Sequence, residues 1–276
     1  MTPAMNRWIA ILRPINGVMG VVATWISAFI AVGLALASYA IPVAIGSAIV
    51  FMVTSGGNIF NDYLDVENDR INHPERPLPS GTIEKRTALS AGILLFVIPL
   101  ALSAVFINIL SLGVVALAEL VLIAYETKTK HLGLTGNVSI SVLVGLIFIF
   151  GGICVDSISR MILLFVMASL ANLSREVIKD IEDMKGDVDR KTFPKTHGVP
   201  EAHAVAAAAV TVAVAISFVP YLLAIFGIEY LLAVIVADAT FIGSIILMPR
   251  NVSLSQNTSK LAMIFGLVSF AIGGLF

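Results

Sequence analysis

The chain has 276 residues, of which 58% are hydrophobic and 13% are charged, and its mean hydropathy is +0.97. That composition excludes an ordinary soluble domain of this length and predicts an integral membrane protein. The formal net charge of −1, with basic residues scattered over several loops, gives no basis for nucleic-acid binding, and the single cysteine, Cys154, excludes a disulfide framework.

Apolar segments long enough to cross a bilayer, about 20 residues each, recur along the whole chain. We predict nine of them, at residues 15–36, 41–61, 88–106, 108–126, 137–155, 159–180, 202–225, 228–247 and 260–275. Short breaks alternate with longer polar connections, so we expect short turns on one side of the membrane and long loops on the other. The predicted fold is all-α: one domain, residues 1–276, with nine transmembrane helices around a central cavity.

A polar motif follows the second apolar segment. Asn61, Asp65 and Asp69 recur at i, i+4 and i+8, which places two carboxylates and one amide on one face if the helix continues. Neighbouring carboxylates on a helix repel each other, so this ladder is typical of a cation site, and Mg²⁺ prefers oxygen ligands. Asn58, one turn deeper, and Asp62, beside Asn61, are candidates for contact with a substrate.

Several basic side chains lie where they could meet the phosphate oxygens of a substrate. Arg76 lies in a loop rich in proline, Lys128 and Lys130 follow the fourth apolar segment, and Arg175 and Lys179 end the sixth. Arginine suits bidentate contact with phosphate, and lysine acts as a point charge. We expect some of these residues to bind a diphosphate, although each alone is more often a charge that sets membrane topology.

Three further residues are candidates for contact with a second substrate. Arg13 precedes the first apolar segment, Glu119 lies within the fourth, and Tyr125 is close to its end. Ionisable side chains inside a membrane are costly, which makes Glu119 a functional candidate. Asp238, in the eighth segment, is distant in sequence from both acidic motifs and could be only a structural hydrogen-bond partner.

A second acidic motif ends the sixth apolar segment. Asp180, Asp183 and Asp187 fall at i, i+3 and i+7, again on one helical face. Solvated helix ends would explain either motif alone, but two such faces that meet across a bundle would hold Mg²⁺ ions around a diphosphate. Each motif is followed by a basic loop, so the halves 1–136 and 137–276 resemble a loose internal repeat.

The basic residues also predict the orientation of the chain in the membrane. Of the 17 Lys and Arg residues, all except Arg160 lie at the N-terminus or on the side of the long loops. Because Lys and Arg mark cytoplasmic loops, we predict a multi-pass protein of the cell membrane whose active site opens to the cytoplasm. A divalent-cation transporter is the alternative from another class, but transport sites are expected near the bilayer midplane on broken helices.

These motifs resemble those of the UbiA superfamily of intramembrane prenyltransferases, and the resemblance covers essentially the whole chain. The first family motif, NxxxDxxxD, matches Asn61, Asp65 and Asp69, and the second, DxxxD, matches Asp183 and Asp187, with Asp180 completing the variant DxxDxxxD. Tyr125 and Lys130 match a further element of the family. The resemblance implies nine helices, a prenyl diphosphate donor, Mg²⁺ as cofactor and the motif aspartates as catalytic residues.

Within this family, the runs 56–81 and 175–187 look most similar to the archaeal branch that makes digeranylgeranylglyceryl phosphate. That likeness implies transfer of a geranylgeranyl group from its diphosphate to a lipid-phosphate acceptor, geranylgeranylglyceryl phosphate, in the bilayer. An aromatic acceptor such as 4-hydroxybenzoate or a naphthoate stays open as the alternative. The sequence predicts no particular oligomeric state.

Overall fold

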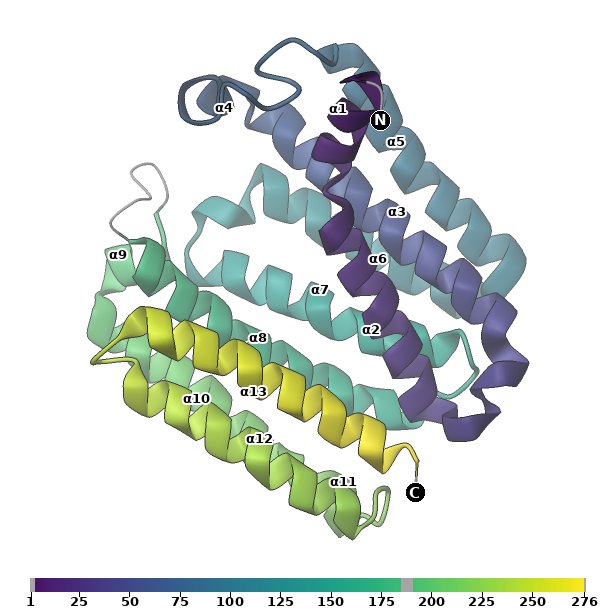
Figure 1. The fold of residues 1–276 in the computed structure, drawn as a ribbon, viewed down its shortest axis with the longest axis vertical. Coiled ribbons are helices and arrows are strands. Elements are labelled where there is room, and N and C mark those ends of the chain that lie inside the picture. Colours follow the sequence, from purple (N-terminus) through teal and green to yellow (C-terminus); the bar gives the residue numbers. More distant parts are fainter. Residues whose placement is uncertain (1–2, 185–190, 276) are drawn as a thin grey trace.

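The computed structural model describes residues 3–184 and 191–275, and all regular secondary structure in that part of the chain is helical (Figure 1). The elements in chain order are α1 (Pro3–Leu12), α2 (Pro14–Val32), η1 (Gly33–Tyr39), α3 (Ala40–Leu64), α4 (Val66–Asn72), α5 (Lys85–Leu102), η2 (Ser103–Ile107), α6 (Ile109–Thr127), η3 (Thr129–His131), α7 (Leu134–Ile153), α8 (Ser159–Asp183), α9 (Phe193–His197), α10 (Val199–Ser217), α11 (Val219–Leu222), α12 (Ile228–Leu247) and α13 (Val252–Gly273). The long helices overlap the apolar segments of the sequence, so the all-helical fold class is confirmed.

In the described part of the chain, seven segments are helices long and apolar enough to cross a membrane. One of them, Pro14–Leu64, contains both α2 and α3, because the 3₁₀ helix η1 continues the helical run between them. Helix α13 has 22 residues but is not among the seven, since polar side chains and Lys260 occupy its first half. Crossing of the bilayer by all nine predicted segments therefore stays a prediction.

Large apolar side chains cover much of the outer surface of the bundle. Leu34 is 83% exposed, Leu222 74%, Leu120 66% and Leu232 63%. A soluble monomer rarely exposes apolar surface on this scale, whereas lipid tails solvate it without cost. The exterior is therefore suited to contact with a bilayer.

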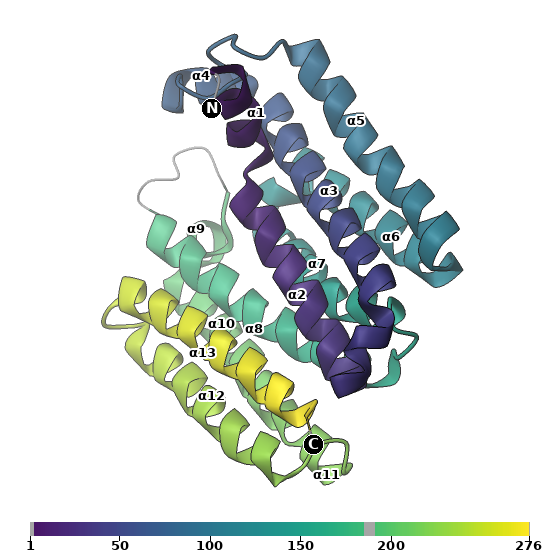
Figure 2. The same cartoon turned by 45° about the vertical axis from the view of Figure 1, so that its right-hand side comes forward.

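Helix α7 lies between two groups of helices. On one side, α3 packs against α2 and α5, and on the other, α8 packs against α10 while α12 packs against α13. Helix α7 contacts α2 and α6 of the first group and α8 of the second, and Figures 1 and 2 show it at the centre of the bundle. The chain is thus arranged as two layers of helices that meet along α2, α7 and α8.

Small residues bring the helix backbones at this seam close together. A Cβ atom on Gly151 of α7 would lie 2.5 Å from Cβ of Ser27 on α2, and one on Gly145 would lie 2.7 Å from the carbonyl oxygen of Phe165 on α8. The Ser27 hydroxyl donates a hydrogen bond of 2.7 Å to the carbonyl of Phe148. Because lipid supplies no hydrophobic force between helices, close packing of small residues is what holds such a seam together.

Both motif-bearing helices end on the same side of the bundle. Figures 1 and 2 place the C-terminal ends of α3 and α8 at the end that carries α4 and α9, with α11 at the opposite end. The loop after α4 is held against this end, because Leu78 and Ile83 are buried in a cluster with Ile11, Ile59 and Val66. The residues that could carry chemistry are therefore collected at one end of a long apolar bundle.

Candidate active site

The first motif lies where α3 gives way to α4. The expectation of one unbroken helix is wrong at Asp65, which separates α3 from α4 with φ −89° and ψ 6°. The backbone N–H of Asp65 still donates to the carbonyl of Asn61 at 2.9 Å, and that of Asp69 donates to the carbonyl of Asp65 at 2.8 Å. The helical spacing of the ladder is thus kept across the break.

Asp65 belongs to a closed group of four side chains. Lys130 Nζ lies 2.8 and 2.9 Å from the two carboxylate oxygens of Asp65 and 3.2 Å from Oε2 of Glu126. Asn61 Nδ2 donates to Oδ2 of Asp65 at 3.0 Å and to Oε2 of Glu126 at 2.7 Å. The Lys130 side chain is only 3% exposed, so this ammonium group sits between two carboxylates largely shielded from water.

The other carboxylates of the first motif are bound by arginines. Arg76 Nη1 donates to both oxygens of Asp69, at 2.8 and 2.7 Å, and lies 4.0 Å from Oδ1 of Asp62. Arg13 forms an ion pair with Asp62, which is buried. Arg13 itself connects α1 to α2 with φ +49°, a left-handed conformation that costs a non-glycine residue about 1 kcal/mol. Arg13 thus pairs with α3, and the loop residue Arg76 covers Asp69.

The second motif lies on the last turn of α8. Asn137 of α7 donates to Oδ2 of Asp180 at 2.9 Å, and Asp183 is exposed. Asp187, the last member of the motif, lies outside the described residues. Arg175 Nη1 lies 2.5 Å from Oε1 of the adjacent Glu176. This motif therefore receives an amide contact from α7.

The remaining predicted residues are spread around this end of the bundle. Asn58 donates to the backbone carbonyl of the last residue of α1 at 3.0 Å. Lys128 is exposed just after α6, while Tyr125 on α6 and Lys179 on α8 are half-buried. Glu119 is buried within α6, and among the described residues its Oε1 has no hydrogen-bond partner.

Two polar residues in contact with the motifs were not identified from the sequence. Glu126 is 7% exposed and Asn137 is 9% exposed. Glu126 precedes Lys130 by four residues, a spacing that brings opposite charges together on a helix, and this signal could have identified it. Asn137 is an amide in an otherwise apolar segment, a position where polar side chains are usually functional or hydrogen-bonded.

The donor set of these motifs fits a cation that prefers oxygen ligands. Within residues 3–184 and 191–275, no three His, Cys, Asp or Glu side chains are gathered tightly enough to form a metal site. The cationic nitrogens of Lys130 and Arg76 lie on the carboxylates of Asp65 and Asp69 instead. These carboxylates are thus already paired with cationic side chains. Carboxylate and amide oxygens are also the ligands that Mg²⁺ prefers.

An apolar cavity begins beside the first motif. The space, which we call the α3/α6 cavity, has a volume of about 500 Å³ and is lined by residues of α2, α3, α6 and α7. Asn58 and Glu126 are among its polar lining residues. Because Glu126 also binds Asn61 and Lys130, the cavity is in direct contact with the charged group around Asp65.

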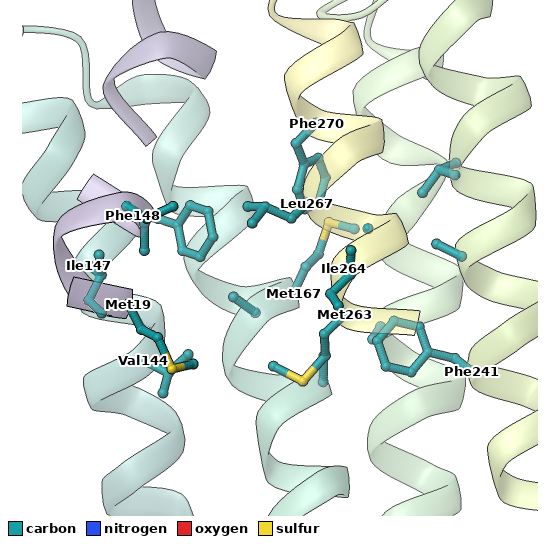
Figure 3. A pocket seen from close by; sticks show the side chains of 18 of the residues that line it. Met19, Val144, Ile147, Phe148, Met167, Phe241, Met263, Ile264, Leu267 and Phe270 are labelled. Atoms are coloured by element: carbon teal, nitrogen blue, oxygen red, sulfur yellow. The ribbon is translucent and has the colours of Figure 1, made fainter. Parts of the chain in front are cut away.

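A second cavity shares lining residues of α2 and α7 with the first. This α8/α13 cavity has a volume of about 420 Å³, and its lining residues include Phe148, Met167, Phe241 and Phe270 (Figure 3). Its lining is apolar apart from Asp238, which accepts a hydrogen bond of 2.7 Å from Ser217. The residues that line both cavities are Met19, Ala23, Val144 and Ile147. The bundle therefore contains two apolar spaces that share a wall.

Comparison with known proteins identifies this arrangement. The model of the UbiA prenyltransferase family matches residues 20–273. The chain belongs to the UbiA prenyltransferase family. It is therefore a multi-pass membrane enzyme that transfers prenyl groups, and the predicted family is confirmed.

Full-length relatives of this UbiA-family chain carry one specific name. It is 37% identical over 279 residues to a digeranylgeranylglyceryl phosphate synthase from Methanosphaera stadtmanae, a match that covers 98% of this chain and 100% of the relative. The identity to the enzyme of that name from Methanothermobacter thermautotrophicus is 36%, over 98% of this chain and 96% of the relative.

Solved structures share the fold over nearly the whole chain. One, described as giving structural and mechanistic insights into digeranylgeranylglyceryl phosphate synthase in membranes, is 31% identical with a TM-score of 0.89, and 99% of each chain is covered. A UbiA homolog from Archaeoglobus fulgidus bound to GPP and Mg²⁺ has a TM-score of 0.69 at 17% identity, with 96% and 99% coverage. The second likeness concerns the fold alone.

Proposed function

We propose that this enzyme transfers a geranylgeranyl group from geranylgeranyl diphosphate to the free hydroxyl of geranylgeranylglyceryl phosphate. The product carries the second ether bond of archaeal membrane lipids, and diphosphate is released. The observation that carries this proposal is the identity of 37% to a digeranylgeranylglyceryl phosphate synthase over 98% of the chain. The placement of both acidic motifs at one end of the bundle supports the same reaction class.

The two motifs supply the ligands for Mg²⁺ in this proposal. The ligands are the side-chain oxygens of Asn61, Asp65, Asp69, Asp180, Asp183 and Asp187. When bound, Mg²⁺ would stabilise the negative charge that develops on the departing diphosphate. The catalytic residues among these are Asp65 and Asp69 from the first motif and Asp183 and Asp187 from the second.

The basic side chains at this end bind the diphosphate oxygens. Lys130 and Arg76 lie on the carboxylates of Asp65 and Asp69, so once those carboxylates take a metal, both cations become available for phosphate. Lys128, Arg175 and Lys179 are the other candidates. The cations on the first motif therefore serve two purposes, because they also neutralise its carboxylates before substrate arrives.

The two apolar cavities suit a reaction in which both substrates carry long isoprenoid chains. The lining of both cavities is mainly apolar, which suits contact with such a chain along its length. The α3/α6 cavity touches the first motif, and the α8/α13 cavity shares its wall. An aromatic acceptor would need only one of these spaces, which favours the lipid-phosphate acceptor.

The chemistry exchanges one bond for another. The bond between C1 of the donor and its diphosphate oxygen breaks, an ether bond forms between C1 and the acceptor oxygen, and the hydroxyl proton passes to the released diphosphate as the ether forms. The apolar lining keeps water from the reactive C1 carbon. Asn58, Asp62, Glu119, Tyr125 and Arg13 are the candidates for contact with the acceptor.

The site is proposed to face the cytoplasm. All 17 basic residues except Arg160 lie on the predicted long-loop side or at the N-terminus, as expected for cytoplasmic segments. The same proposal includes nine helices that cross the membrane. It also includes a single domain over residues 1–276, made of halves 1–136 and 137–276.

An acceptor panel tests the proposed function. Purified protein is incubated with labelled geranylgeranyl diphosphate, Mg²⁺ and either geranylgeranylglyceryl phosphate, 4-hydroxybenzoate or a naphthoate. We expect a labelled ether lipid with the first acceptor only. Turnover of an aromatic acid without ether formation would overturn the acceptor assignment, and Mg²⁺ flux in proteoliposomes without any transfer would favour a transporter.

A further inference from the structure

Glu126 is the residue that connects the α3/α6 cavity with the first acidic motif. It lies on the last turn of α6, is 7% exposed and lines the cavity. Its Oε2 accepts hydrogen bonds from Asn61 Nδ2 at 2.7 Å and from Lys130 Nζ at 3.2 Å. Both donors also bind Asp65, so donors and carboxylates alternate around a closed group.

The contacts of Asn61 determine which way its amide points. Both of its recorded partners, Asp65 and Glu126, are carboxylate oxygens. An ionised carboxylate only accepts hydrogen bonds, so the amide must present its NH₂ group to both of them. Oδ1, the one atom of this side chain that can bind a metal, is therefore directed away from these two carboxylates.

The positive charge of Lys130 is balanced by two carboxylates. Its ammonium group is 3% exposed and pairs with both Asp65 and Glu126. A ligand that takes over the Asp65 carboxylate removes one of these partners, and a buried charge left without a partner costs several kcal/mol, roughly. Glu126 supplies the partner that stays, so Lys130 is retained beside the cavity when Asp65 changes partner.

We propose that Glu126 is a positioning residue for the metal-diphosphate site: it fixes the Asn61 amide with Oδ1 available as a ligand and holds Lys130 in reach of the diphosphate. The inference rests on the proposed function, because it assigns Asn61 and Lys130 the roles given above. In this role the Glu126 carboxylate contacts neither the metal nor the reacting atoms.

The test compares Glu126→Gln with wild-type protein in two assays. Glutamine keeps the size of the side chain but removes the charge, and its own NH₂ group could face Oδ1 of Asn61. Loss of a partner that orients a ligand typically weakens metal affinity or activity about 10–100-fold. We expect the Mg²⁺ concentration for half-maximal transfer to rise by about that factor, while KM for the acceptor lipid stays within about twofold of wild type.

The second assay needs no turnover. Mg²⁺ with inorganic pyrophosphate should raise the thermal unfolding midpoint of the wild-type protein in detergent, because binding to the native state stabilises it. We expect a much smaller rise for Glu126→Gln at the same concentrations. Glu84→Gln, which changes an exposed carboxylate before α5, is the matched control and should behave like wild type.

A double variant shows whether Glu126 acts through Lys130. Residues in one hydrogen-bonded group give effects that are not additive, so Glu126→Gln combined with Lys130→Met should cost about tenfold less than the product of the two single effects. Fully multiplicative effects, or a Glu126→Gln protein whose Mg²⁺ dependence is within twofold of wild type, would overturn the proposal. So would a change confined to the KM of the acceptor, which would make Glu126 part of the cavity wall only.

Two further outcomes keep the test decisive. If Glu126→Gln does not fold, Glu126→Asp is judged by the same criterion: a rise of at least about fivefold in the Mg²⁺ requirement supports the proposal, and wild-type behaviour contradicts it. If the wild-type protein transfers no geranylgeranyl group, the proposed function fails, but the pyrophosphate assay still decides whether Glu126 supports binding.

Discussion

The two acidic motifs differ in how the rest of the molecule holds them. In the first, Asp65 is paired with Lys130 and Asp69 with Arg76, and the adjacent Asp62 is paired with Arg13. In the second, Asp180 receives the Asn137 amide, Asp183 is exposed, and Arg175 pairs with its neighbour Glu176. The first motif is thus charge-compensated by side chains of other segments before any ligand binds, and the second is contacted at Asp180 by an uncharged amide of α7.

This difference suggests a division of work between the motifs. A carboxylate that is already paired with Lys or Arg must exchange that cation for a metal, and the exchange delivers the cation to the diphosphate. In the second motif, Asp183 on the last turn of α8 is exposed to solvent. We therefore expect the first motif to be sensitive to the loss of Lys130 and Arg76 as well as to the loss of its carboxylates.

Removal of a motif carboxylate should have the largest effect. Asp65→Ala and Asp183→Ala should each lower the rate of prenyl transfer by about a thousandfold or more, because stabilisation of the leaving group by the metal contributes several kcal/mol. The rate is measured with labelled geranylgeranyl diphosphate, and circular dichroism checks the fold. Turnover like that of the wild type in either variant would refute the metal role of that motif.

Removal of Lys130 should affect stability as well as activity. Lys130→Met leaves the half-buried Asp65 and the buried Glu126 without their shared cation, which should lower the free energy of unfolding by roughly 3 kcal/mol in the absence of metal. Mg²⁺ should restore part of the lost stability, since it replaces the missing charge. Thermal unfolding with and without Mg²⁺ measures both effects, and Lys195→Met, at an exposed site on α9, serves as control.

A smaller effect is expected when Asn137, whose amide binds Asp180 of the second motif, is replaced. Asn137→Ala removes the hydrogen bond to Asp180, and the loss of such an orienting partner should raise the Mg²⁺ requirement by about tenfold. Titration of transfer against Mg²⁺ gives the value. Asn257→Ala, an exposed amide on α13, should leave it unchanged. An unchanged requirement in Asn137→Ala would mean that Asp180 needs no support from α7.

The smallest effect should come from a change that keeps the charge at Arg76. Lysine keeps the positive charge but lacks the planar guanidinium group that suits bidentate contact with phosphate, so Arg76→Lys should raise KM for geranylgeranyl diphosphate by only about threefold to tenfold. Arg76→Ala should raise it further. Equal KM values in the two variants would show that the charge of Arg76 does not contribute to diphosphate binding.

The helices could be predicted from the sequence because each is a long apolar run, and the two motifs could be predicted because their spacing is local. The break at Asp65 could not, since its backbone hydrogen bonds continue the helical pattern on both sides of it. The pairing of Lys130 with Asp65 joins residues 65 positions apart, as does the contact between Asn61 and Glu126. Such contacts follow from the packing of α6 on α3, and no local pattern encodes them.

The two apolar cavities also follow from packing rather than from pattern. Met19, Ala23, Val144 and Ile147 look like ordinary members of apolar segments, yet they form the wall between the two spaces. The sequence predicts a central cavity in general terms, and the tertiary structure shows which residues line the two apolar spaces.

The central claim is that carboxylates from both motifs act on one diphosphate. A structure of this protein with Mg²⁺ and a non-hydrolysable thio analogue of geranylgeranyl diphosphate tests it most directly. The account predicts metal ions that join the diphosphate to Asp65 or Asp69 on one side and to Asp183 or Asp187 on the other, with Lys130 moved from Asp65 to a phosphate oxygen. A diphosphate held by one motif alone, with the other motif turned to solvent, would contradict it.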